Sequence, residues 1–234
     1  MIISHKHRFI FIKTSKTAGT SIEIALSEIC GDDDVITSVS PDDEVLRHRR
    51  GGRSPQNYHV RKSAYGTVDY IKSAFGNKKK FRAHSGAIYI KNNIEPEIWD
   101  TYYKFCFERN PWDRTVSYYN FLKNHGPEKT TGYLSLPDFI STDRPYRLKK
   151  RGFYNYTISG SIAVNRVCLY ENLEAELEYV CNHVLGISRP VNLPHAKGQF
   201  RSGDRDYRKI LGKEGRDRIA QIFADEIMLF GYSY

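Results

Sequence analysis

Residues 9–21 read FIFIKTSKTAGTS. The apolar run at 9–12 is typical of a buried β-strand, and it leads through a short polar loop into an amphipathic helix. A helix start presents backbone N–H groups that have no partner inside the helix, and these attract anions. Gly19 lets the main chain approach a ligand, while Lys13 and Lys16 add positive charge. The stretch therefore predicts a phosphate or sulfate ester bound where a strand turns into a helix.

The order of residues in this loop differs from the P-loop of ATP- and GTP-binding proteins. That motif, GxxxxGK[ST], places its lysine directly after the last glycine, and it occurs nowhere in the chain. Here Lys16 precedes Gly19, and the hydroxyls of Thr20 and Ser21 follow. Taken alone, the loop has an alternative interpretation as an ordinary strand-to-helix turn capped by Thr or Ser.

A second anion-binding pattern follows another predicted strand, residues 102–108. The next residues read RNPWDR and begin a helix, for which Asn110 suits the N-cap and Pro111 the first turn. Arg109 stands at the end of the strand, where its guanidinium can bind a phosphate with two hydrogen bonds. Ser117 lies about two turns into the helix and can donate a further hydrogen bond. The alternative is an ion pair for Arg109 and a solvated position for Ser117.

Together the two stretches resemble the sulfotransferases that use 3′-phosphoadenosine-5′-phosphosulfate (PAPS). The loop is similar to their Pro-Lys-Thr-(Gly/Ala)-Gly-Thr-Ser pattern for the 5′-phosphosulfate, with Ser15 where proline is usual. The second stretch is similar to their 3′-phosphate segment, which uses an arginine and a serine eight residues later, and RNPWDR is common in the carbohydrate branch. The resemblance implies PAPS as donor and 3′,5′-ADP as product. It assigns donor contacts to Lys13, Thr17, Ala18, Gly19, Thr20, Ser21, Arg109 and Ser117.

The resemblance also implies catalytic roles. Lys16 would stabilise negative charge that develops on the leaving oxygen. The acceptor hydroxyl needs a base, and His84 in the sequence RAHSG occupies a place comparable to the base histidine of glycan O-sulfotransferases. His59, His195 and loop carboxylates are rivals, and a lone histidine is more often structural. No carboxylate cluster with metal-ligand spacing accompanies the loop, so no metal is expected.

Two further matches are weaker. Residues 166–170 read as a strand. Its last residue begins the sequence Tyr-Glu-Asn-Leu at 170–173, which is similar to the family's segment near the adenine pocket. Tyr170 would then lie beside the adenine ring. A core aromatic residue at the end of the strand is an equally good explanation. Lys197 and Arg201 resemble the late basic segment that closes over the nucleotide in this family, and simple solvated cations are the alternative.

Strands that alternate with helices favour an α/β fold with a mainly parallel sheet covered on both faces. Its loops should meet beyond the carboxyl ends of the strands. The expected strands are 9–12, 81–84, 102–108 and 166–170. The expected helices are about 20–29, 65–75, 87–92, the one from 111, the one from 173, and one that includes 219–230. With the resemblance, this implies a single three-layer, P-loop-like domain over residues 1–234, with loop-rich insertions at 32–80 and 124–162 on the acceptor side.

Composition indicates which partners and which environment suit the chain. The 234 residues carry a formal charge of +9, which favours anionic partners. The four cysteines show no metal-ligand spacing, so buried free thiols are expected. No secretory segment or membrane span is visible, which predicts a cytoplasmic protein if the chain is complete. A chain from which a membrane anchor had been removed would show the same sequence features.

The preferred interpretation is a PAPS-dependent sulfotransferase acting on a hydroxyl, most simply that of a glycan or another polyhydroxylated molecule. A P-loop nucleotide kinase or NTPase is the first alternative, disfavoured because GxxxxGK[ST] is missing. A non-catalytic nucleic-acid-binding protein is the second, disfavoured because the cations concentrate in two phosphate-type loops and two insertions. The sequence leaves the acceptor and the oligomeric state open.

Overall fold

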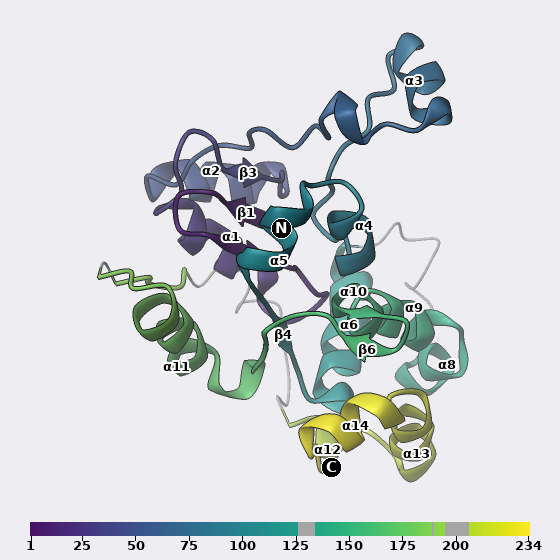
Figure 1. Cartoon of the computed structure of the whole chain (residues 1–234). Helices are drawn as coiled ribbons and strands as arrows, with labels where there is room; N and C mark the ends of the chain where they lie inside the picture. The colour runs from purple at the N-terminus through teal and green to yellow at the C-terminus, as the bar shows by residue number, and fades with distance from the viewer. Residues whose placement is uncertain (126–133, 189, 195–205) are drawn as a thin grey trace.

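A five-stranded sheet in the order β3-β1-β2-β4-β7 forms the centre of the molecule (Figure 1). The computed structural model describes residues 1–125, 134–188, 190–194 and 206–234. The strands are β1 (Ile2–Ser4), β2 (Phe9–Phe11), β3 (Val35–Ile36), β4 (Tyr103–Glu108) and β7 (Arg166–Leu169). β4 pairs in parallel with β2 and β7, whereas β1 is antiparallel to both of its neighbours. Four strands therefore point the same way, and the expected mainly parallel sheet is confirmed.

The alternation of side chains along β2 explains the layers on either side of the sheet. Phe9 and Phe11 face one way and pack with α1 (Gly19–Ser27) and α11 (Leu173–Glu178). Ile10 and Ile12 face the other way, because successive residues of a strand point to opposite faces. That second layer contains α4 (Ala87–Lys91), α5 (Pro96–Thr101) and α10 (Phe153–Tyr156). An apolar run without polar alternation thus gives a strand buried on both faces.

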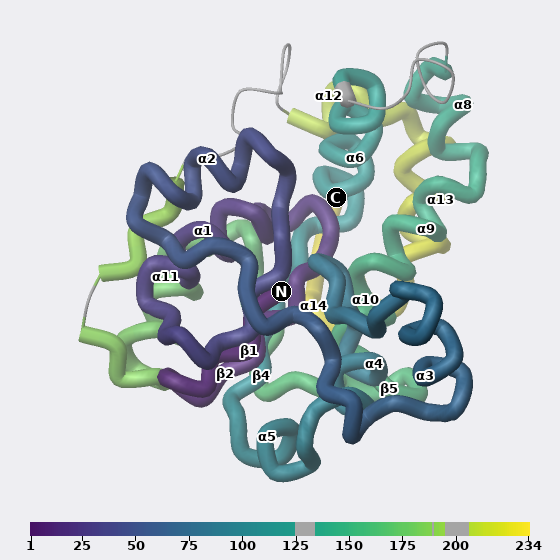
Figure 2. Tube along the Cα trace, turned by 90° about the horizontal axis from the view of Figure 1, so that it is seen from above, coloured from purple at the N-terminus to yellow at the C-terminus, as the bar shows by residue number. Residues whose placement is uncertain are grey.

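A third apolar cluster lies among helices and includes no residue of the sheet. It is built around Trp112, Phe139, Ile219 and Phe223. Figure 2 shows these helices grouped on one side of the molecule, with α1, α2 (Pro41–Arg49) and α11 on the other. The helices that contribute are α6 (Pro111–His125), α8 (Leu136–Ser141), α9 (Arg144–Lys150), α12 (Tyr207–Ile210), α13 (Lys213–Ile222) and α14 (Ala224–Phe230).

Two strands of the sheet, β1 and β3, are absent from the prediction. They have three and two residues, too few for a periodic pattern, and their place is set by long-range pairing: Ile2 lies opposite both Phe11 and Ile36. Residues 32–80 otherwise hold short elements as expected: α2, a 3₁₀ turn η1 (Lys62–Ala64) and α3 (Thr67–Ala74).

The predicted strand over residues 81–84 is wrong. The backbone turns here, because the Ser85 N–H donates to the Arg82 carbonyl at 2.9 Å and the Ser85 hydroxyl accepts from the Arg82 N–H at 2.9 Å. Such a side-chain contact competes with strand pairing.

The segment 124–162 is less loop-rich than predicted. Its described part contains α8, α9, α10 and a small hairpin of β5 (Thr157–Ile158) and β6 (Ser161–Ile162). The predicted terminal helix is two helices, α13 and α14, which meet at Phe223. After β7 a 3₁₀ turn, η2 (Tyr170–Asn172), leads into α11, which continues as a π-helical turn, η3 (Tyr179–Val184).

Two expectations from composition can be compared with the structure. All four cysteines are buried free thiols, as predicted, and burial raises the pKa of each. In the part of the chain that the structure describes, no helix combines the length and the apolar character needed to cross a membrane.

Candidate functional site

The segments singled out in the sequence meet at one edge of the sheet. β2, β4 and β7 are parallel, so their carboxyl ends lie together, and each is followed by one of the predicted segments. Arg109 Nη1 donates to the Lys16 carbonyl at 3.0 Å, and its guanidinium lies over the Tyr170 ring, 4.0 Å from the centroid. His84 Nδ1 lies 3.0 Å from the Lys13 carbonyl oxygen. The predicted common rim is therefore confirmed.

The loop between β2 and α1 has an unusual backbone. Lys16 and Ala18 have φ angles of 67° and 58°, in the left-handed region that residues with a Cβ rarely adopt. Such strained residues concentrate at ligand sites and persist only where the surrounding structure holds them. Ala18 is the N-cap of α1 and supplies no side-chain acceptor. The first N–H groups of α1 are therefore not capped by an N-cap side chain, which suits an anion.

Contacts on both sides of Ser15 fix this loop. The Ser15 N–H donates to the Arg151 carbonyl at 2.8 Å, and its carbonyl accepts from Arg114 Nε at 2.9 Å. One residue earlier, the Thr14 hydroxyl donates to the Phe107 carbonyl of β4 at 2.5 Å. The loop conformation thus depends on groups from three other segments.

Arg114 is a buried residue beside the loop, and the sequence reasoning missed its contacts. It is fully buried and donates through Nη1 to Glu108, whose other oxygen accepts from the Tyr156 hydroxyl at 2.8 Å. A Cβ at Gly152 would stand 2.0 Å from Arg114 Nη2, so this position has no room for a side chain. The second arginine of RNPWDR could have indicated this. No acidic residue stands three or four positions away on the same face of the helix, so a buried guanidinium at this position must pair with a carboxylate from another segment.

Lys16, the predicted catalytic residue, is partly exposed at the rim. Its Nζ lies over the Phe121 ring of α6, 4.3 Å from the centroid. Gly19 begins α1, and a Cβ there would come within 2.7 Å of Lys13 Cγ, so the lysine stem explains the glycine as well as a ligand would. Thr20 is partly exposed and Ser21 is buried in the first turn of α1.

Lys13 points into the interior rather than along the loop. Its Nζ donates to Glu23, a fully buried carboxylate of α1. Burial alone would raise the pKa of Glu23, but Lys13 and the amino-terminal group lower it to about 2. A buried ammonium needs such a counter-charge. The charge of Lys13 is balanced there, and its direct contact with a donor stays a prediction. Thr17 is also turned inward, with its hydroxyl 2.7 Å from that of Thr14.

Arg109 is held in one orientation. Its Nε and Nη2 donate to Asp113, and Nη1 donates to the Lys16 carbonyl. Among the described residues, these contacts use three of the five N–H groups of the guanidinium and leave one hydrogen on each Nη nitrogen for another acceptor. Asp113 and Ser117 are four residues apart in α6, so the Ser117 hydroxyl lies on the same helix face one turn further along. Asn110 accepts from the Trp112 N–H at 3.1 Å, as expected of a cap.

His84 has the tautomer that a base requires. A carbonyl oxygen only accepts, so Nδ1 donates its proton to the Lys13 carbonyl and Nε2 keeps its lone pair. Burial, with Lys13 second, lowers the pKa of His84 to about 4, and the ring is neutral at pH 7. Asn155 Nδ2 donates to the same Lys13 carbonyl at 3.2 Å and to the His84 carbonyl at 3.3 Å, which holds the two segments together.

The remaining predicted residues are placed as follows. Tyr170 begins η2 and stacks on Arg109, so its contact with an adenine ring stays a prediction. Lys197, Arg201 and the rival base His195 lie outside the described residues. The other rival, His59, is exposed and stacks on Tyr58 with ring centroids 4.8 Å apart.

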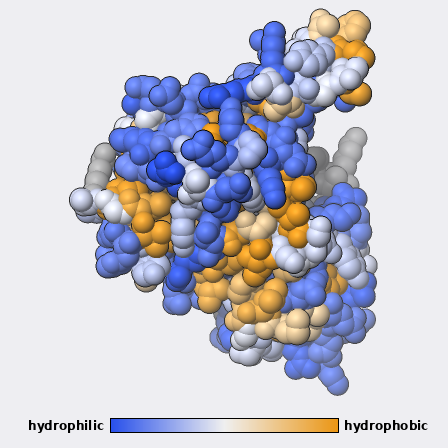
Figure 3. Space-filling view, in the orientation of Figure 1, coloured by the Kyte–Doolittle hydropathy of each residue, from blue (hydrophilic) through white to orange (hydrophobic). Residues whose placement is uncertain are grey.

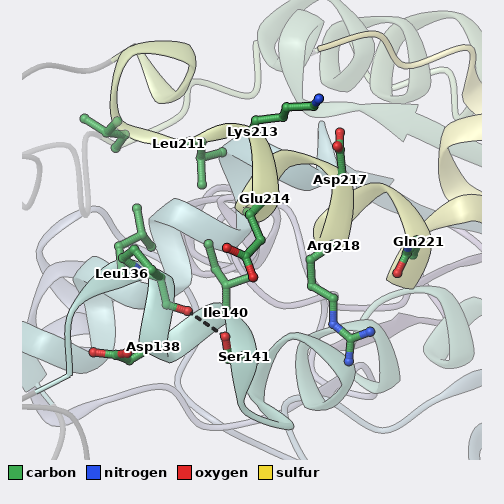
Figure 4. A pocket seen from close by; sticks show the side chains of 14 residues that line it. Leu136, Asp138, Ile140, Ser141, Leu211, Lys213, Glu214, Asp217, Arg218 and Gln221 are labelled. Atoms are coloured by element: carbon green, nitrogen blue, oxygen red, sulfur yellow. Dashed lines mark hydrogen bonds between the residues drawn. The ribbon is translucent and has the colours of Figure 1, made fainter.

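A cleft of about 850 Å³ opens between α8 and α13 (Figure 4). Its wall combines Ile140 and Leu211 with charged residues of both signs, among them Asp217 and Arg218. None of the predicted site residues lines it. The cleft therefore does not contribute to the rim that contains Lys16.

Glu226, close to the Arg114 network, makes stability depend on pH. It is fully buried, neither of its oxygens accepts a hydrogen bond from the described residues, and the nearest cation, Lys149, is 3.5 Å away. Burial, aided by Glu108, raises the pKa of Glu226 to about 7. The folded state thus favours the neutral acid, and stability should fall as the pH rises from about 4.5 through 7.

Glu226→Gln should remove this pH dependence. We expect the variant to be more stable than the wild type by about 3 kcal/mol at pH 8, with the difference vanishing near pH 4. Urea unfolding at the two pH values measures it. A difference of the same size at both values would contradict the assignment.

Over nearly its whole length the chain is similar to a known protein family. The model of the sulfotransferase family matches residues 1–233. An uncharacterized protein of Archaeoglobus fulgidus is 28% identical over 123 residues, which are 52% of this chain and 96% of that protein. No solved structure matches. Because the family match covers nearly the whole sequence, the chain belongs to the sulfotransferase family.

Proposed function

We propose that the chain transfers a sulfuryl group from PAPS to a hydroxyl of a carbohydrate or similar polyhydroxylated acceptor. The observation that carries this proposal is the hydrogen bond of 3.0 Å from Arg109 to the Lys16 carbonyl. It joins the segment that resembles a 3′-phosphate site to the one that resembles a 5′-phosphosulfate site. A nucleotide with anionic groups at both ends fits two cation-bearing segments in contact.

Different residues of the rim would bind the two ends of the donor. The N–H groups at the start of α1, which the N-cap side chain does not cap, and the hydroxyl of Thr20 would hold the 5′ end. The two remaining N–H groups of Arg109 and the Ser117 hydroxyl would hold the 3′-phosphate. When bound, PAPS supplies the sulfuryl group and an anionic leaving group. Lys16 would then stabilise the charge that develops on the leaving oxygen.

The acceptor side would be formed by residues 32–80 and 124–162 of a single domain. Both segments differ from the parts that carry the donor motifs, and the first leads directly to His84. The Nε2 lone pair of His84 would accept the proton of the acceptor hydroxyl while Nδ1 stays bound to the Lys13 carbonyl.

His84→Ala should lower kcat by about 10²-fold or more and leave the affinity for 3′,5′-ADP unchanged. The wild-type kcat/KM should stay flat as the pH falls towards 5 and drop near the lowered pKa of about 4, where the base becomes protonated. His59→Ala is the matched control and should behave as wild type. Turnover that survives in His84→Ala would show that another group is the base.

Arg109→Ala should weaken donor binding more than turnover. We expect the Kd for 3′,5′-ADP to rise about 10–100-fold, because charge-assisted hydrogen bonds to the 3′-phosphate are lost. The affinity for 5′-AMP, which lacks that phosphate, should change little. Isothermal titration with both nucleotides measures the contrast, and an equal loss for both would contradict the 3′ assignment. Ser117→Ala should give the same pattern with a smaller effect.

The geometry supports a P-loop kinase or NTPase less well. In such enzymes a carboxylate at the end of a strand helps to hold Mg²⁺. The carboxylate at the end of β4 is Glu108, and its two oxygens are occupied by Arg114 and Tyr156.

One experiment tests the proposal against both alternatives. Labelled sulfate from PAPS should appear on one or more members of a panel of glycans and small alcohols. In thermal-shift measurements 3′,5′-ADP should stabilise the protein and ATP with Mg²⁺ should not. Stabilisation by ATP–Mg²⁺ alone would favour the kinase, and salt-sensitive binding of oligonucleotides without transfer would favour the nucleic-acid-binding alternative.

A further inference from the structure

Helix α3 carries its apolar side chains towards solvent. Val68, Ile71 and Phe75 recur at the spacing that places them on one helix face, and they are 60%, 56% and 81% exposed. Figure 1 shows α3 at the end of a projection from the body, and Figure 3 shows apolar surface gathered at its outer end. We call residues 61–80 the arm. A stripe of this kind normally packs on a core, so its exposure indicates an interaction surface.

The inner side of α3 is already occupied. Tyr70 packs edge-on against Tyr65, with centroids 5.4 Å apart, and its hydroxyl donates to the Lys62 carbonyl at 3.0 Å. Lys79 Nζ lies 2.8 Å from Asp69 Oδ2. These contacts fix the rotation of the helix and keep the apolar stripe outward.

The base of the arm is a short antiparallel neck. The Val60 N–H donates to the Lys79 carbonyl at 3.0 Å, and the Phe81 N–H donates to the Tyr58 carbonyl at 2.8 Å. Val60 and Phe81 are buried in the second layer of the sheet. The arm is thus anchored in the core at its base while its outer end stands in solvent.

Charge gathers on the same arm. It contains six lysines and arginines and one carboxylate, a net charge of +5 within a chain of +9. Lys72 lies on α3 next to Ile71, and Lys78 and Lys80 follow Phe75; all three cations are exposed. The arm therefore combines an apolar stripe at its outer end with exposed cations on α3 and on the segment that leads back to the neck.

We propose that the arm binds an anionic lipid surface. The apolar side chains of α3 would enter the boundary between head groups and acyl chains, while the lysines contact acidic head groups. A polysaccharide or nucleic acid would use the cations but not the apolar stripe. A second copy docked arm to arm would bring two charges of +5 together. The arm is the outer part of the segment 32–80 that the proposed function assigns to the acceptor side, but lipid binding by it requires neither donor nor acceptor.

Sedimentation with vesicles tests it without donor or acceptor. The wild-type chain should bind vesicles of phosphatidylcholine that contain about one third phosphatidylserine, and should bind pure phosphatidylcholine at least about tenfold more weakly. Ile71→Ser/Phe75→Ser should weaken binding to the anionic vesicles at least about tenfold. Lys72→Glu/Lys78→Glu should weaken it by a similar or larger factor. Met228→Ser, which changes an apolar residue of α14 that is 77% exposed, is the matched control and should bind as wild type.

Three outcomes would overturn the proposal. The first is no binding of the wild-type chain to the anionic vesicles. The second is unchanged binding by Ile71→Ser/Phe75→Ser, which would leave charge alone and point to a soluble polyanion. The third is a concentration-dependent rise in mass by light scattering that this double variant abolishes without any vesicle binding, which would identify a second copy as the partner. Because the substituted side chains are exposed, circular dichroism should show the fold unchanged in each variant.

Discussion

Lys16→Ala should lower kcat for sulfate transfer by about 10²–10³-fold, the loss typical when one preorganised group that stabilises transition-state charge is removed. The ammonium stands at the rim beside Phe121, close to the loop that the proposal assigns to the 5′ end of the donor. Single-turnover measurements with saturating PAPS separate this effect from donor affinity.

The controls for Lys16→Ala follow from the geometry. The affinity for 3′,5′-ADP should change far less than kcat, because the α1 N–H groups and Arg109 remain. Lys91→Ala removes an exposed lysine of α4 and should keep full activity. Activity of Lys16→Ala within tenfold of the wild type would exclude the lysine as the group that stabilises the leaving oxygen.

Arg114→Met should destabilise the fold by about 3–5 kcal/mol. The substitution leaves Glu108 as a buried carboxylate without its cation and removes the donor to the Ser15 carbonyl. Because Ser15 precedes Lys16, turnover of the folded fraction should fall as well. Urea unfolding gives the stability, and assays below the transition give the activity.

A surface ion pair provides the comparison for Arg114. Arg147 and Asp143 pair at 2.7 Å with side chains 67% and 63% exposed, and Arg147→Met should cost at most about 0.5 kcal/mol. Adding Glu108→Gln to Arg114→Met should restore part of the lost stability, since the uncompensated charge disappears. Strict additivity of the two substitutions would show that the pair is not coupled.

The sequence was sufficient for the parts of the fold that are local. The strand at 9–12 and the helix that follows have strong patterns, and the meeting of Lys16, Arg109 and Tyr170 follows from the rule that parallel strands end at one edge. His84 reaches the same rim without a strand before it, through its hydrogen bond to the Lys13 carbonyl.

What the sequence could not predict depends on distant partners. Lys13 looks like a second loop cation, but Glu23 on the far side of the turn draws its ammonium inward. Arg114 acquires its role from Ser15, Glu108 and the space left by Gly152, which are spread over the chain. The short strands β1 and β3 likewise exist only through pairing with each other and with β2.

The left-handed backbone of Lys16 and Ala18 affects the rate and the entropy of ligand binding. Since Arg151, Arg114 and Phe107 hold the preceding residues from three directions, the loop has its shape before any nucleotide arrives. The entropy lost in ordering these residues belongs to the folding step, so association should be fast and should order little further backbone at this end of the ligand. A more pliable loop of the same residues would bind the same anion more weakly without losing a single contact.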